Sequence, residues 1–231
     1  MSKRYYLTLI KIIGIACVLI LFFYNVYLQA QLITWARNYG GVEYEEATAI
    51  QQTSDAGYII SGYVDSSGSG NCDFLIIKMD MFGEVEWQKT YGGAADDEVY
   101  AIQETNDRGY IVAGFTNSFG AGNYDFWVLK LNEYGTIVWQ RTYGGSYTER
   151  AWTVQQTGDL GYIVAGSTQS FGGWGSMQYF FLKLDSDGEI LWQKTYDALG
   201  YDAITSIQQT NDKGYIAVGT SQGDFVGLTD F

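Results

Sequence analysis

A segment that begins with tryptophan and leads into Tyr-Gly-Gly recurs along the chain at a nearly fixed spacing. Copies begin at Trp35, Trp87 and Trp139, and a weaker copy ending in Tyr-Asp begins at Trp192. Successive tryptophans are separated by 52, 52 and 53 residues. A fixed period of this size indicates a repeat architecture, in which each unit buries its apolar face against its neighbours. The period therefore constrains the fold more tightly than the activity.

The second repeat predicts four short β-strands. We expect them at residues 99–105, 110–116, 125–131 and 136–143, separated by two tight turns and a glycine-rich loop. Short segments rich in β-branched and aromatic residues, bounded by turn residues, are typical of strands. The chain has 29 glycines, no proline and 17% aromatic residues, a composition that suits many short strands joined by glycine turns. The sequence therefore predicts an all-β protein.

Two motifs resemble those of known repeat proteins. Turns of the form Thr-x-Asp-x-Gly-aromatic resemble the Asp-box hairpin of sialidase-type propellers and contain four aspartates with an expected structural role: Asp55, Asp107, Asp159 and Asp212. We expect each aspartate to bind its own turn, and the following glycine to take the left-handed conformation. Residues 80–87 and 185–192 resemble the tryptophan-docking motif of quinoprotein-like propellers.

The chain thus resembles prokaryotic cell-surface β-propeller repeat proteins. This resemblance implies four-stranded blades, with structural tryptophans packed between adjacent blades: Trp35, Trp87, Trp139 and Trp192. The blades are expected at about 46–93, 98–145, 150–197 and 203–231, with 32–41 as a lone outer strand. The last blade is partial if Asp230 starts its third strand, so the prediction is an incomplete propeller of three full blades plus partial ones. A third strand from Asp224 is the alternative, and it would permit a closed four-bladed ring.

Residues 1–30 predict a signal peptide or a membrane anchor preceding the repeat domain at 31–231. Lys3 and Arg4 precede an uninterrupted apolar and aromatic run at 12–24, and an anchor would form an N-terminal hydrophobic helix. Either interpretation places the repeats outside the cytoplasm, with the membrane as a partner of the N-terminal segment. The formal net charge of −13 argues against a nucleic-acid partner, because phosphate backbones are repelled.

Ligand binding is expected on the face that carries the long loops. Its candidate residues are Glu45, Glu46, Asp96, Asp97, Glu149 and Trp174. An acidic and aromatic rim could bind a cation, a sugar or a basic protein, and a solvated acidic surface is the simpler alternative. The chain has no histidine, the commonest general base and metal ligand. We predict no catalytic residue, no metal site and no cofactor.

Two classes of function remain open. The first is an extracytoplasmic β-propeller that acts as a binding or scaffold surface for protein or carbohydrate. The alternative is a fragment of a quinoprotein-type enzyme, or an incomplete gene product without independent activity. Near-uniform repeats favour the first, because an enzyme is expected to break the repeat pattern where its chemistry lies.

Overall fold

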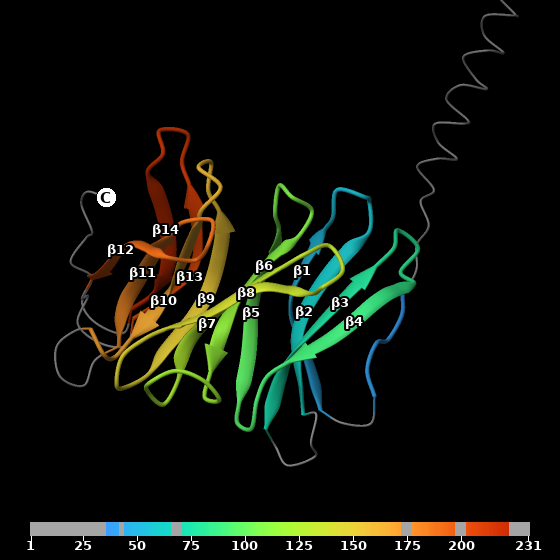
Figure 1. Ribbon diagram of the computed structural model, residues 1–231, viewed down its shortest axis with the longest axis horizontal. Helices are drawn as coiled ribbons and strands as arrows, with labels where there is room; N and C mark the ends of the chain where they lie inside the picture. Colours follow the sequence, from blue (N-terminus) through green and yellow to red (C-terminus); the bar gives the residue numbers. More distant parts are fainter. Residues whose placement is uncertain (1–35, 42–43, 66–70, 172–176, 197–201, 222–231) are drawn as a thin grey trace, which may run out of the picture. The chain divides into compact units, whose positions relative to one another are not determined.

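The computed structural model describes residues 36–41, 44–65, 71–171, 177–196 and 202–221. Within these ranges the chain is all-β, with 14 antiparallel strands and no helix. Three sheets have four strands each in chain order, and the last two strands form a sheet of their own. The sheets follow one another in a row, with the first and last sheets at its two ends (Figure 1). In the described residues they do not close into a ring.

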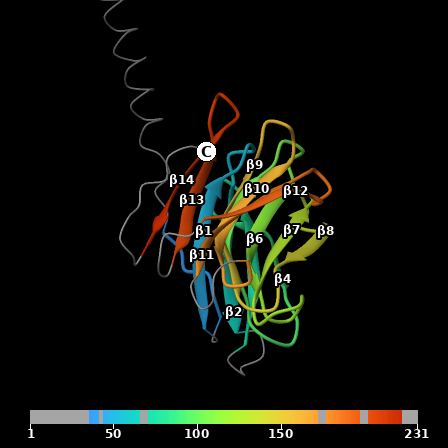
Figure 2. The same cartoon turned by 90° about the vertical axis from the view of Figure 1, so that its left-hand side faces the viewer.

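The four sheets repeat one plan. The first comprises β1 (Glu45–Gln52), β2 (Tyr58–Asp65), β3 (Cys72–Met79) and β4 (Val85–Tyr91). The second comprises β5 (Asp97–Glu104), β6 (Tyr110–Thr116), β7 (Asp125–Leu131) and β8 (Ile137–Tyr143). The third comprises β9 (Glu149–Gln156), β10 (Tyr162–Thr168), β11 (Gln178–Leu184) and β12 (Ile190–Tyr196), and the last comprises β13 (Ala203–Gln209) and β14 (Tyr215–Thr220). Figure 2 looks along the row from the β13–β14 end.

Strand positions in the second repeat agree closely with those expected. β6 and β7 have the predicted bounds, and β8 begins one residue later. β5 begins two residues earlier than expected, because Asp97 still pairs with Thr116.

The apolar core lies between neighbouring sheets. Between the first and second sheets, Phe74 packs on Trp127 with ring centroids 4.5 Å apart. Between the second and third, Phe126 packs on Phe180 at 5.1 Å. β6 and β7 are buried along their whole length, so both faces of the second sheet are covered. Each buried residue of this size contributes about 1.5–3 kcal/mol, and no sheet can gain that stabilisation alone.

A β-bulge shapes the pairing of the first two strands in every sheet. In the second sheet the β5–β6 register shifts between Val99 and Ala101, and comparable shifts occur in the others. Gly114 lies beside this bulge, where a Cβ atom would be 2.0 Å from the carbonyl oxygen of Glu98. Only glycine lets the two backbones approach so closely.

The left-handed residue of the first turn is not the glycine, so that prediction was wrong. It is the residue before the glycine: Ala56, Arg108, Leu160 and Lys213 have φ of 67°, 64°, 66° and 71°. The turn closes with a hydrogen bond from Arg108 N–H to the Thr105 carbonyl at 2.8 Å, which places the left-handed conformation at its fourth residue. Gly109 is needed for space, since a Cβ there would lie 2.2 Å from the Leu131 carbonyl oxygen.

The N-terminal region is only partly described. The chain divides into two units, Met1–Asn38 and Tyr39–Phe231, and all sheets belong to the second. Residues 36–41 form no strand, so the expected lone outer strand at 32–41 is absent from its described part. Residues 1–30 and Trp35 lie outside the described ranges. Within those ranges, no helix is long and apolar enough to cross a membrane.

Candidate functional site

Three tryptophans of the repeated segment lie against the sheet that follows them. The Trp87 ring meets Tyr110 of the second sheet edge-on, with centroids 5.9 Å apart, and its Nε1–H donates to the Glu133 carbonyl at 3.2 Å. The equivalent ring pairs, each at 5.8 Å, are Trp139 with Tyr162 and Trp192 with Tyr215. These side chains therefore join neighbouring sheets at one edge of the core.

The tyrosine of the same segment forms a second contact between sheets. The Tyr91 hydroxyl donates to the Gly135 carbonyl at 2.6 Å, and Tyr143 donates to Gly188 at the same distance. Tyr39 donates to the Gly83 carbonyl of the first sheet, also at 2.6 Å. The chain around Tyr39 therefore contacts the first sheet as a preceding repeat would, although it forms no strand there.

The four aspartates of the first turns bind their own turn. Asp107 accepts hydrogen bonds from the Thr105 hydroxyl and from Gly109 N–H, the latter at 3.1 Å. It also pairs with Lys130 Nζ at 2.9 Å. The same pairs recur as Asp55 with Lys78 at 2.8 Å and Asp159 with Lys183 at 3.0 Å, while Asp212 is held by Thr210 and Gly214.

These three lysines are buried at 3–4% exposure and were not among the residues predicted from the sequence. Their signal was a lysine at the next-to-last position of each apolar third strand, in β3, β7 and β11. Partial burial raises the pKa of Asp55 and Asp159, but hydrogen bonds from the lysine and the turn threonine outweigh it and lower both to about 2. The same balance lowers the pKa of Asp107.

Glu45, Asp97 and Glu149, predicted to be ligand-binding residues, occupy one equivalent position at the start of a first strand. Asp97 and Glu149 are fully buried, which corrects their expected place on an exposed rim. The reason is that each carboxylate holds the preceding Gly-Gly turn. Gly41, Gly93 and Gly145 donate their N–H groups to Glu45, Asp97 and Glu149 at 2.7, 2.8 and 2.7 Å.

The other predicted rim residues bind separate partners. Exposed Glu46 accepts hydrogen bonds from the hydroxyls of Tyr44 and Tyr63 at 2.8 and 2.7 Å. Asp96 accepts the N–H of Cys72 at 3.2 Å. Trp174 lies outside the described residues. Across the part of the chain that the structure describes, no three acidic or cysteine side chains converge in a way that could hold a metal ion.

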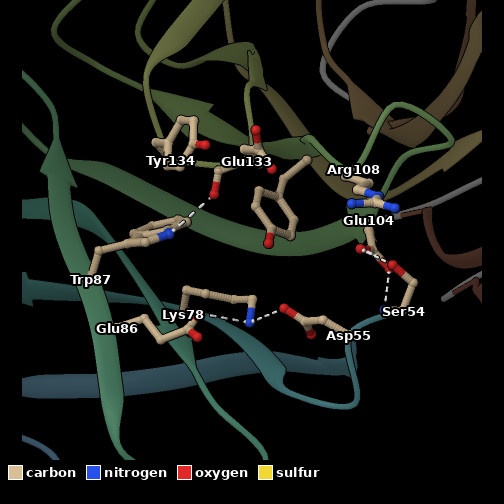
Figure 3. A pocket seen from close by; sticks show the side chains of 10 residues that line it. Ser54, Asp55, Lys78, Glu86, Trp87, Glu104, Arg108, Glu133 and Tyr134 are labelled. Carbon is tan, nitrogen blue, oxygen red and sulfur yellow. Dashed lines mark hydrogen bonds and ion pairs between the residues drawn. The ribbon is translucent and has the colours of Figure 1, made fainter.

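A pocket of about 510 Å³ lies at the other end of the first strands from these carboxylates, where the short turns of the first and second sheets meet (Figure 3). At one end Lys78 lies between Asp55 and Glu86, at 2.8 and 3.0 Å. At the other end Glu104 holds Ser54, through the backbone N–H at 2.7 Å and the hydroxyl at 2.8 Å.

Aromatic rings and a second cation complete this pocket. Trp87, Tyr110 and Tyr134 line it together with Arg108 and Glu133. Arg108 lies beside Glu104, and Trp87 points toward Glu133 (Figure 3). Four carboxylates therefore share the pocket with two cations and three aromatic side chains.

An equivalent pocket of about 410 Å³ occurs at the second junction. A pocket of about 370 Å³ at the third junction overlaps the equivalent position through Trp192, Lys213 and Tyr215. The second pocket has Val138 in place of Glu86, Leu160 in place of Arg108 and Gln156 in place of Glu104. The first pocket is therefore the more highly charged version of a repeated feature. The sequence already contains a signal of this difference, because the residue before the tryptophan is Glu86 in the first repeat but Val138 and Leu191 in the next two.

Comparisons with known proteins add no family. No protein-family model matches this chain, and no curated protein matches it. The function of the pocket is therefore inferred from its geometry.

Proposed function

We propose that this chain is a β-propeller repeat protein that acts as a binding surface outside the cytoplasm, and that the pocket between its first two sheets binds a carbohydrate. The propeller assignment is supported by the antiparallel order of strands within each sheet. It is also supported by contact between the first strands of successive sheets, β1 with β5, β5 with β9 and β9 with β13. In propellers these inner strands surround a central axis.

The observation that carries the carbohydrate proposal is the departure of the first pocket from the equivalent pocket at the second junction. Glu86 takes the place of Val138 and Leu191 in the later repeats, and Arg108 takes the place of Leu160 at the second junction, so a carboxylate and a cation both lie in the pocket of the Trp87 ring. A sugar hydroxyl both donates and accepts hydrogen bonds, so it can pair with carboxylates and with cations in one small space. The apolar face of a sugar ring can pack on an aromatic side chain.

The location rests on residues 1–30, whose basic start and apolar run favour export or membrane attachment. The alternative ligand for such a binding surface is a protein. It would use the acidic surface of a chain with a net charge of −13, through long-range attraction to a basic partner.

Glycan-array screening of the full chain, followed by calorimetric titration of each glycan that binds, tests this proposal. Glu86→Val and Arg108→Leu each introduce the residue found at that position of the second junction, Val138 and Leu160, so the fold should tolerate them. We expect each change to weaken glycan binding at least about tenfold, the effect of losing one or two hydrogen bonds to charged groups. Lys213→Leu, the matched change in the third pocket, should leave binding unchanged.

The proposal fails if no glycan binds, or if Glu86→Val and Arg108→Leu bind as tightly as the parent chain. Incubation with pyrroloquinoline quinone and calcium tests the enzyme alternative on the same sample. Cofactor absorbance that stays with the chain through gel filtration, together with quinone-dependent turnover, would favour that alternative over a binding protein.

A further inference from the structure

At each junction, two hydrogen bonds of opposite direction join the first strand of one sheet to the first strand and the first turn of the preceding sheet. At the second junction, Gln103 Oε1 accepts the N–H of Gln156 at 2.6 Å, and Gln156 Oε1 accepts the N–H of Asn106 at 2.9 Å. We call this pair of bonds the glutamine clamp. The first and third junctions repeat it through Gln51 with Glu104 and Glu104 with Ser54, and through Gln155 with Gln209 and Gln209 with Gly158.

The end sheets carry the two halves of a further clamp. Gln52 of the first sheet holds the position of Gln156, while Gln208 and Asn211 of the last sheet hold the positions of Gln103 and Asn106. All three residues are exposed. Within the described part of the chain, no hydrogen bond of the clamp type engages them.

Exposed apolar side chains accompany these halves. Ile50 on β1 is 64% exposed, whereas its counterparts at the three junctions, Ile102, Val154 and Ile207, are 6–8% exposed. On β14, Ile216 and Val218 are 58% and 60% exposed, although their counterparts Ile111 and Ala113 are fully buried. Apolar residues that are buried at every internal junction are therefore open to solvent at the two ends.

We propose that the open face of β1 in one copy of this chain binds the open face of the β13–β14 hairpin in a second copy, head to tail. The contact continues the interface that already joins neighbouring sheets within one chain. Each face meets a different face of its partner, which makes the contact heterologous. Tyr39 already contacts the first sheet, where its hydroxyl donates to the Gly83 carbonyl. The hairpin of the second copy would therefore pack on the part of this sheet formed by β1, next to Ile50 and Gln52.

Cysteine cross-linking of the full chain in detergent micelles tests this contact. In a Cys17→Ala, Cys72→Ser background, one batch carries Gln52→Cys and a second, differently tagged batch carries Gln208→Cys. We expect mild oxidation of the mixture to link one batch to the other, with far less linkage within either batch. Gln103→Cys with Gln156→Cys in one chain is the matched control, because it places the same pair of positions at an existing junction.

Absence of linkage between the batches, when the control pair forms its bond, overturns the proposal. A chain carrying both Gln52→Cys and Gln208→Cys distinguishes contact between two chains from contact between the two ends of one chain. Linkage between chains supports the second copy. A bond formed within a single chain means that the chain closes on itself, and it overturns the proposal.

Sedimentation velocity gives an independent readout. The parent chain should show concentration-dependent mass above that of the monomer. Ile50→Asp and Val218→Asp should each weaken association about 100-fold, because each buries a charge in the contact. Leu191→Asp, on an exposed position of β12, should not. Mixing Ile50→Asp with Val218→Asp should restore association, because one intact junction remains, and a mixture that stays monomeric contradicts the head-to-tail arrangement.

Discussion

Lys130 and Asp107 form an ion pair in which only the lysine is buried. Their side chains are 6% and 64% exposed, and Nζ lies 2.9 Å from the carboxylate. Nζ also donates to the Leu131 carbonyl at 3.0 Å. The aspartate therefore provides the counterion for an ammonium group that is buried within the apolar third strand. Loss of the two partners should then have unequal effects.

Asp107→Ala is expected to lower the free energy of unfolding by about 3 kcal/mol, because it leaves a buried ammonium group without its counterion. Lys130→Met should cost about 1 kcal/mol, since the remaining carboxylate is already in contact with water. Urea unfolding followed by tryptophan fluorescence measures both changes. Equal losses for the two variants would mean that burial of the lysine does not control the pair.

Leu160→Gly is expected to raise the free energy of unfolding by about 0.5–1 kcal/mol. Leu160 has φ of 66° and is 52% exposed, so glycine relieves a left-handed conformation while little packing is lost. Leu191→Gly is the control within a strand, and it should destabilise by about 0.5–1 kcal/mol. A melting temperature that falls for Leu160→Gly would contradict this prediction.

Tyr143→Phe removes the donor to the Gly188 carbonyl, a buried hydrogen bond of 2.6 Å. An unpaired buried carbonyl group should cost about 1–2 kcal/mol, measured by thermal or urea unfolding. Tyr147→Phe, at a position that is 56% exposed, serves as the comparison and should change stability very little. If both variants unfold like the parent chain, the hydroxyl does not help to join the sheets.

Acid should weaken the turns that contain the paired aspartates. The pKa of Asp55 and Asp159 is about 2 in the folded chain, below the usual value of about 3.9 for an unfolded aspartate. The stability that they contribute is present above about pH 4 and is lost as the pH falls towards 2.

Burial has the opposite effect at Asp97 and Asp125, whose pKa it raises. Their contribution is present below about pH 4 and is lost as the pH rises through the raised value. Unfolding free energies measured from pH 2 to 6 should therefore show two opposing trends. Asp97→Asn should remove part of the loss at higher pH, while Asp159→Asn should remove part of the loss in acid. Unchanged pH profiles for both variants would refute this assignment.

The period and turn residues of the sequence predicted most of the strands, because alternation and turn chemistry are local properties. β6 and β7 have the expected bounds for this reason. The burial of Asp97 could not be predicted in this way, since it depends on the distant hydroxyl of Ser118, which donates to it at 2.7 Å. The charged pocket was also missed. It forms only when the turns of two repeats meet, and no single repeat contains both Glu86 and Arg108.

The glutamine clamp has a consequence for how such a chain can change in length. Three junctions use the same pair of bonds between the same positions, so a repeat interacts with any neighbour in the same way. A duplicated segment of about one period, such as 98–149, would bring both halves of a clamp with it and would need no new contacts. Repeats of this kind can replace one another. Unequal recombination between them would therefore lengthen or shorten the protein while the core contacts between sheets are kept.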